Sequence, residues 1–242
     1  MITSATTLGL IIPFYYLMPV LSTSILVGAT IGSLIPDIDG SDALIFHKDV
    51  LLNKKEWAQV FNLFPGIVLP FFGYMTKYMV YFPSVLLFKI VLPRHYRPSY
   101  GHRKYMHSLL GLVVTTLITG VYAVIGLNLI KPVNLEFLTV LTAFLAGYLF
   151  GALLHLLEDS CTKTGIMFLY PFSHRKIKGN IVTGKDKIKP LTLFLALSIF
   201  TAIGLYLTVT SNPTNAFKTV LGLNTAFWIF FMTFIANINA SN

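Results

Sequence analysis

Carboxylate and imidazole side chains gather at three places along this 242-residue chain, each at the end of a long apolar stretch. Such side chains are common protein ligands of divalent transition metals, and a metal held by them can activate water for hydrolysis. The three clusters therefore predict a metal centre. Their members are Asp37 and Asp39 after the first stretch, His102 and His107 before the second, and His155, Glu158 and Asp159 at the end of the third.

The acidic clusters stand where helix electrostatics disfavour them. Pro36 disfavours helical geometry at Ile35, so we expect the first apolar helix to end there, with Asp37 and Asp39 just beyond it. The C-terminal end of a helix carries a partial negative charge, and the third cluster ends another helix in the same way. Each acidic pair therefore calls for a cation, supplied either by Lys and Arg or by a metal.

The histidines favour the metal. His102 and His107 precede a helix that we expect to begin near Ser108, its predicted N-cap. The positive end of that helix favours neutral imidazole, which is the form that binds metal. His155 and Asp159 are four residues apart and therefore share one helix face, as two ligands of one ion would.

Two rows of small residues indicate which helix faces meet. Small residues at four-residue spacing let membrane helices approach closely. If the two rows pack together, the acidic turn after Pro36 comes beside the third cluster. One row is Gly28 and Gly32, and the other is Gly147 and Gly151, which continues at the same spacing to His155 and Asp159.

Each of these residues also has a simpler interpretation. Asp37 and Asp39 suit a solvated turn, and His155 suits a hydrogen bond to a neighbouring helix. Arg103 and Lys104 could serve only to set the membrane topology, and the glycine rows could serve packing alone. The metal interpretation is favoured because the pattern repeats at three helix ends.

Composition indicates that the surrounding medium is the bilayer. The chain is 55% hydrophobic and 11% charged, against roughly a quarter charged in an ordinary soluble domain. A membrane-spanning helix needs about 20 apolar residues. Four stretches meet this requirement: Leu109 to Ile130, Leu135 to Leu157, Leu191 to Thr210, and Phe217 to Ile235.

Two further apolar regions are broken by proline. Leu8 to Ile35 contains Pro13 and Pro19, so it is either one kinked helix or a short interfacial piece followed by a crossing from about Val20. Val60 to Leu92 contains three prolines and is too long for one straight span, which favours a helical hairpin or a re-entrant pair.

The predicted fold is therefore an all-α, polytopic transmembrane helix bundle with about six membrane segments, including a Pro-broken hairpin. We expect one integral membrane domain over residues 1–242. Within it, residues 20–183 form the core with the metal site, residues 58–93 an apolar hairpin insertion, and residues 190–237 a C-terminal helix pair.

The distribution of basic residues gives the orientation. Of 18 Lys and Arg, three lie in residues 37–57, four in 94–107 and seven in 158–189. By the positive-inside rule these segments face the cytoplasm, with the N-terminus outside and the C-terminus inside. The formal charge of +9 is thus a topology signal, and no nucleic-acid-binding motif accompanies it. The single cysteine, Cys161, suits packing better than nucleophilic chemistry.

Three motifs in this order resemble the YdjM family of membrane-bound metal-dependent hydrolases. They are Pro36-Asp37-Ile38-Asp39, the stretch from Gly101-His102-Arg103 to His107-Ser108-Leu109, and the stretch from Gly147-Tyr148-Leu149 to Asp159. The resemblance covers roughly residues 28–183. It implies that the metal-site positions are Asp37, Asp39, His102, His107, His155 and Asp159.

The chain departs from that family pattern in two places. Family members carry a histidine close to the N-terminus, where this chain has Thr6 and Thr7, and His47 is the candidate replacement. The stretch from Lys48 to Tyr100 is also longer and more apolar than the family pattern implies, and would close a lipid-access groove or bind a partner.

These observations predict a multi-pass hydrolase of the plasma or inner membrane. Its site, on the cytoplasmic face, would hold one or two divalent ions, with zinc, manganese or iron preferred by the mixed ligands. The substrate would be an ester or phosphoester of a membrane lipid or lipid-linked molecule. Asp39 or Glu158 would be the general base, and Arg103, Lys104 and Arg175 would bind the phosphate or carboxylate.

The alternative is a membrane protein that binds a divalent metal without catalysis, as a transporter or a metal-stapled scaffold. A transporter needs ionisable residues deep within several spans, whereas here they cluster at one face. A scaffold would lose stability without its metal and would turn over no substrate.

Overall fold

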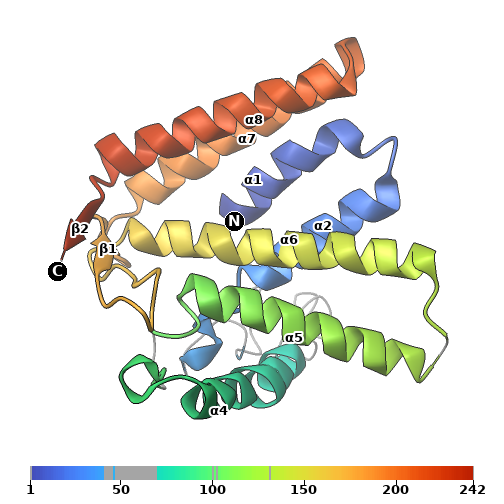
Figure 1. Cartoon of the computed structure of the whole chain (residues 1–242). Helices are drawn as coiled ribbons and strands as arrows, with labels where there is room; N and C mark the ends of the chain where they lie inside the picture. The colour runs from blue at the N-terminus through green and yellow to red at the C-terminus, as the bar shows by residue number, and fades with distance from the viewer. Residues whose placement is uncertain are drawn as a thin grey trace, which may run out of the picture.

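The computed structural model describes residues 2–40, 46, 70–99, 101, 103–130 and 132–241, and it is built almost entirely of helices (Figure 1). The α-helices are α1 (Ile2–Ile11), α2 (Pro19–Gly32), α4 (Phe82–Val91), α5 (Leu109–Asn128), α6 (Leu135–Ser160), α7 (Ile188–Thr210) and α8 (Pro213–Phe230). Short 3-10 turns are η1 (Ile12–Phe14), η2 (Pro36–Asp39) and η5 (Arg94–Tyr96), and π-helical turns are η4 (Thr76–Tyr81) and η6 (Phe231–Ile235). Strands β1 (Lys176–Lys178) and β2 (Asn239–Ser241) pair antiparallel.

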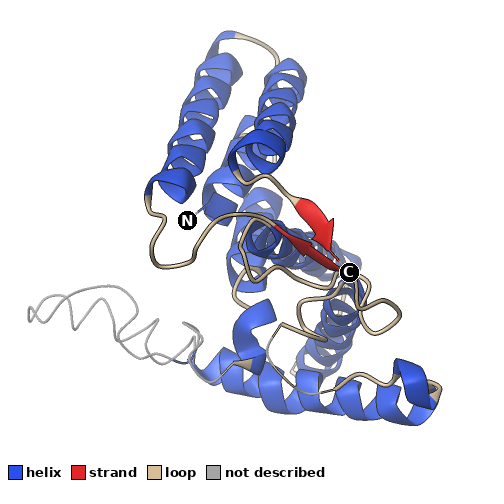
Figure 2. Cartoon of the chain, turned by 90° about the vertical axis from the view of Figure 1, so that its left-hand side faces the viewer, coloured by secondary structure: helices blue, strands red, loops and turns tan. Residues whose placement is uncertain are grey.

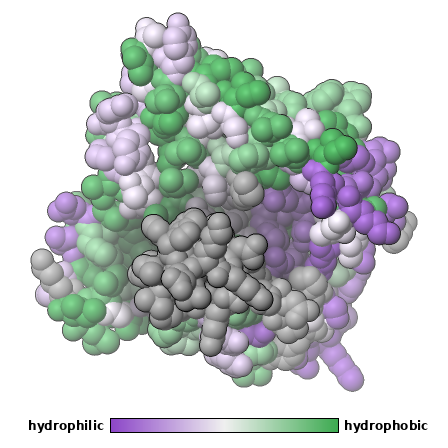
Figure 3. Space-filling view, turned by 180° about the vertical axis from the view of Figure 1, so that it is seen from behind, coloured by the Kyte–Doolittle hydropathy of each residue, from purple (hydrophilic) through white to green (hydrophobic). Residues whose placement is uncertain are grey.

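The predicted all-α transmembrane bundle is confirmed. Within the described ranges, five helical segments are long and apolar enough to cross a membrane: Pro19–Asp39, Leu109–Asn128, Leu135–Ser160, Ile188–Thr210 and Pro213–Ile235. Hydrophobic residues cover much of the visible surface of the bundle, and hydrophilic residues gather toward the end that carries β1 and β2, on the right of Figure 3. The membrane-spanning segments and the gathering of hydrophilic residues at one end therefore indicate the same direction for the membrane normal.

The N-terminal apolar region is a hairpin. The chain turns after η1, which contains Pro13, and α2 begins at Pro19, so the region is not one kinked helix and a separate crossing begins near Val20 as predicted. The piece before it is α1, which packs against α7 and α2. The 13 residues from Ile2 to Phe14 span only about 20 Å, which is short of a hydrocarbon core of about 30 Å.

This hairpin overturns the predicted placement of the chain ends. The Thr3 hydroxyl donates a hydrogen bond to Glu158 Oε1 (2.9 Å), so α1 begins beside the end of α6. The pairing of β2 with β1 brings the C-terminal strand to the same end, because the residues after β1 bond to Thr162 and Ala236. The prediction that the two termini face opposite sides of the membrane is therefore wrong.

Helices α2 and α6 pack backbone against backbone through the two glycine rows. A methyl group added at Gly28 or Gly32 would overlap the backbone of Phe144 or Tyr148 in α6. A methyl group added at Gly147 of α6 would overlap the backbone of Ile25 in α2, and one at Gly151 would overlap the backbone of Ala29. The predicted packing of these two rows is confirmed, and it aligns the end of α2 with the end of α6.

The start of α5 is fixed by a side-chain cap. Ser108 Oγ accepts a hydrogen bond from the Gly111 amide (3.1 Å) and donates one to the Tyr105 carbonyl (2.7 Å), as an N-cap does. The segment before α5 folds tightly onto its first turn, because a methyl group at Gly111 would meet the Tyr105 carbonyl. This fold-back buries His107 completely.

Residues 70–91 form one helical stretch through η4 and α4, and it runs across the direction of the long helices (Figure 2). Tyr81 and Val85 of this stretch are buried against Ile38 and Tyr105, close to the ends of α2 and α5. The first arm of the predicted hairpin, residues 60–69, lies outside the described residues. The described arm covers the core beside the acidic turn.

We predict that Gly151→Val destabilises the protein by about 3 kcal/mol, because the larger side chain must displace the α2 backbone. Thermal or SDS unfolding in mild detergent measures this loss. Gly126→Val on α5 is the matched control, since nothing lies within 4 Å of the added group, and we expect a change within about 0.5 kcal/mol. Equal stability of the two variants would contradict the close packing of α2 on α6.

Candidate metal centre

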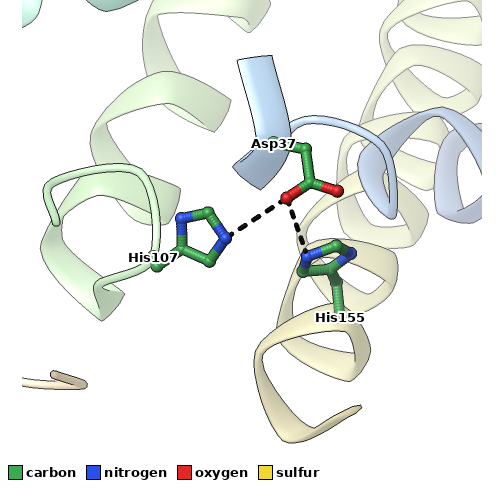
Figure 4. A group of neighbouring side chains, drawn as sticks. All are labelled: Asp37, His107 and His155. Carbon is green, nitrogen blue, oxygen red and sulfur yellow. Dashed lines mark ion pairs between the residues drawn. The ribbon is translucent and has the colours of Figure 1, made fainter. Parts of the chain in front are cut away.

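Three side chains from separate parts of the sequence point toward one another at the end of α2 and α6 (Figure 4). Asp37 lies on η2, His107 on the loop before α5, and His155 in the last turns of α6. Asp37 Oδ1 is 3.4 Å from His107 Nε2 and 3.6 Å from His155 Nε2. One ligand atom of each lies within 4.8 Å of the others, so a single ion could contact all three.

Asp159 supplies a fourth donor atom to the same place. Its Oδ2 atom lies 3.3 Å from His107 Nε2 and 3.9 Å from His155 Nε2. Asp159 Oδ2 and His155 Nε2 are both buried, and in the described part of the chain their polar neighbours belong to this same cluster. Buried carboxylate and imidazole atoms that face one another, with no other hydrogen-bond partner there, fit a bound cation.

Asp39 lies on the opposite side of the His107 ring from Asp37. Its Oδ2 atom is 3.7 Å from His107 Nδ1, and both side chains are fully buried. A carboxylate at one ring nitrogen holds the proton there and leaves the other nitrogen free to bind metal. The short turn η2 thus places Asp37 and Asp39 at different nitrogens of the His107 ring, although the two acids look equivalent in the sequence.

The carboxylates around His107 determine its protonation. Burial alone would lower the pKa of His107, but the surrounding Asp159, Asp37 and Asp39 outweigh it and raise that pKa to about 10. Without a metal, the ring therefore carries a proton and a positive charge at neutral pH. A divalent ion would replace that proton as the partner of the carboxylates.

The predicted anion-binding residues differ in their surroundings. Arg103, which has a positive φ of 59°, reaches Asp159 Oδ1 (3.3 Å) and Thr162 Oγ1 (3.4 Å). Lys104 donates instead to Ser99 Oγ (3.0 Å). Arg175 is exposed before β1, and its side chain makes no hydrogen bond or ion pair with the cluster among the described residues. His102 lies outside the described residues.

Glu158 reaches α1 through Thr3. Besides accepting the hydrogen bond from Thr3, it lines a cavity of about 210 Å³ together with Asp159, Thr162 and Asp186. Thr3 was not among the predicted site residues, because its only signal in the sequence is a hydroxyl group within an apolar helix. The cavity gives the acidic end of α6 a second open side.

The missing N-terminal histidine is not replaced by the threonines at its place. Thr6 and Thr7 donate to carbonyls of their own helix, at Ile2 (3.0 Å) and Thr3 (2.8 Å). His47, the proposed substitute, lies outside the described residues. Cys161 is buried, and burial raises the pKa of its thiol to about 12, so the thiol is unreactive and suits packing.

We predict that metal affinity rises about tenfold per pH unit between pH 6 and pH 8, because each ion must displace the proton from His107. Titration against a metal indicator at several pH values measures the slope. His95→Ala, which changes an exposed histidine, should leave the slope unaltered. An affinity independent of pH would show that His107 is not a ligand.

We predict that Asp39→Asn weakens metal binding about 10- to 100-fold without abolishing it, because Asp39 orients His107 through Nδ1. Equilibrium metal titration compares this variant with Asp37→Asn, which removes a direct donor and should have the larger effect. If Asp39→Asn abolishes binding as completely as Asp37→Asn, Asp39 is itself a ligand.

A family model described as YdjM inner membrane protein matches residues 2–238, nearly the whole chain. The chain therefore belongs to this family of inner membrane proteins, as its motifs predicted. No curated protein and no solved structure matches it.

Proposed function

We propose that this member of the YdjM family is a membrane-embedded, metal-dependent hydrolase of an ester or phosphoester in a lipid or lipid-linked substrate. The observation that carries the proposal is the convergence of Asp37, His107 and His155, with Asp159 beside them, where the C-terminal ends of α2 and α6 meet. Two imidazoles with carboxylates form the kind of donor set that catalytic zinc sites use.

The donor set suits zinc, manganese or iron, because imidazole and carboxylate together favour these ions over calcium. The described residues gather around one position, which supports one ion there. When bound, the ion would lower the pKa of a water molecule and polarise the scissile group. Asp37 is the accessible side of the cluster, since its side chain is 38% exposed while His107 is fully buried.

We assign the proton-accepting role to Glu158 and a positioning role to Asp39. Glu158 lines the cavity next to Asp159, where water and substrate have room. Thr3 holds one carboxylate oxygen of Glu158, which fixes the direction of the other. Asp39 is enclosed against His107, so it would orient that ring rather than meet the substrate.

Arg103 is the best-placed candidate to bind the substrate anion. Its side chain already neutralises Asp159, and its guanidinium has further N–H donors that suit bidentate contact with a phosphate. Lys104 and Arg175 would contribute to the charge of the surroundings, since Lys104 is held by Ser99 and Arg175 is exposed.

The position of the site along the membrane-spanning segments supports a lipid substrate. Its residues lie at the ends of segments long enough to cross the membrane, which is where lipid headgroups lie. The basic residues of the same loops favour the cytoplasmic side for this end and would attract anionic lipids.

A metal-stapled scaffold is the second candidate. It is favoured by one observation: the three donors come from elements that are distant in sequence, so an ion would tie α2, α5 and α6 together. A scaffold and a hydrolase hold the metal with the same residues, and only turnover separates them.

We predict that purified wild type contains about one divalent ion per chain and hydrolyses a phospholipid presented in vesicles. Asp37→Ala and His155→Ala should lose both metal and activity, and His95→Ala should keep both. Glu158→Gln should keep its metal and lose about 10²- to 10⁴-fold in turnover, because only the proton acceptor is removed. Metal analysis and hydrolysis of phosphatidic acid, phosphatidylglycerol and a polyprenyl diphosphate make the comparison.

Metal that survives both alanine substitutions would refute the site. Metal that is lost with stability, in a protein that hydrolyses none of these lipids, would favour the scaffold.

A further inference from the structure

An open groove of about 530 Å³ lies between α1, α2 and α7, away from the metal cluster. Helix α1 lies between α7 and α2 in Figure 1, and each of the three helices contributes to the lining. Its lining includes Ser4 and Leu8 of α1, Leu26 and Thr30 of α2, and Phe194 and Ser198 of α7.

The hydroxyl groups of this groove are largely engaged within the protein. Thr30 donates to the Leu26 carbonyl (2.9 Å), and Ser198 donates to the Phe194 carbonyl (2.8 Å). Thr201, which also lines the groove, donates to carbonyls of α7 and α1. The surface offered to a ligand is therefore predominantly apolar, as for a hydrocarbon chain.

In a bilayer the groove would face the hydrocarbon layer. Two of its walls, α2 and α7, belong to segments that can cross the membrane, and Leu8 on the third wall is exposed. Water is excluded from that layer, and an empty apolar void loses packing contacts. The molecules available to fill the groove in the bilayer are lipid chains.

The end of the groove at Ser4 and Thr30 leads toward the acidic end of α6. Ser4 follows Thr3, whose hydroxyl is bonded to Glu158, and Thr30 stands two turns before Asp37 on the same chain segment. The other side of α2 is closed, because the glycine rows pack its backbone against α6. A chain lying along α2 toward the site therefore has room on the α1 and α7 side.

We propose that the α1–α2–α7 groove holds an acyl chain of the lipid substrate while its headgroup reaches the metal cluster. This inference rests on the proposed hydrolase function, since it names the lipid in the groove as the molecule that is cleaved. Thr30 and Ser198 are then specificity-determining residues, because side chains of greater volume there would exclude the chain.

The test uses phosphatidic acid with a photoreactive diazirine in the middle of one acyl chain, incorporated with full-length protein into nanodiscs. Mass spectrometry of the cross-linked peptides should find the label concentrated on α1, α2 and α7. Thr30→Trp, which fills the groove from an exposed position, should lose several-fold of that label. Val27→Trp is the matched control, since Val27 is exposed on the same helix outside the groove.

A second measurement separates the substrate from a bystander lipid. Thr30→Trp should raise the KM for dioleoyl phosphatidic acid several-fold, whereas Val27→Trp should leave that KM unchanged, with wild-type metal content in both variants. Label spread equally over all lipid-facing helices, or an unchanged KM for the dioleoyl lipid, would overturn the inference. Absence of hydrolysis in wild type, with its metal bound, would instead refute the proposed function. The assignment of the groove lipid as substrate would then be wrong as well. The labelling experiment would still decide whether the groove binds lipid.

Discussion

The backbone contact between α2 and α6 is the constraint on which the rest of the structure depends. Glycines at matching positions on both helices allow each to lie against the backbone of the other, so neither can slide or rotate without a clash. The turn that follows α2 is consequently held beside the last turns of α6. The relative position of Asp37 and His155 is therefore a product of packing several turns away.

The charges at this junction explain why the contact needs more than packing. Two helices end there with partial negative charges, and four acids lie in the last turn of α6 or just beyond α2, so the folded chain must supply or bind positive charge. Arg103 offsets part of it through Asp159, and the imidazole of His107 offsets more by holding a proton. A divalent ion would do the same with better geometry, which links binding of metal to stability of the bundle.

Sequence periodicity predicted the main features of this site. The glycine rows identified the helix faces that meet, and the N-cap at Ser108 located the start of α5. Both rest on local rules, in which spacing along one helix decides geometry. The membrane segments were predictable for the same reason, since their length and composition suffice.

Other features depended on how distant segments meet and could not be predicted. The placement of Asp39 behind the His107 ring follows from the turn geometry of η2, and two acids two residues apart look equivalent in sequence. The contact of Thr3 with Glu158 required the hairpin of α1 and α2, whose direction no charge in the first 36 residues specifies. The crosswise course of residues 70–91 likewise follows from packing on Ile38 and Tyr105.

X-ray absorption spectroscopy of the zinc-loaded protein tests the assignment of the metal ligands, because it reports the atoms around the ion. We expect nitrogen and oxygen ligands at about 2.0–2.1 Å from the ion, including two imidazole rings. His155→Ala should lose the ion or one of the two rings. A shell without imidazole, or one that His155→Ala leaves unchanged, would contradict the assignment of Asp37, His107 and His155 as the metal centre.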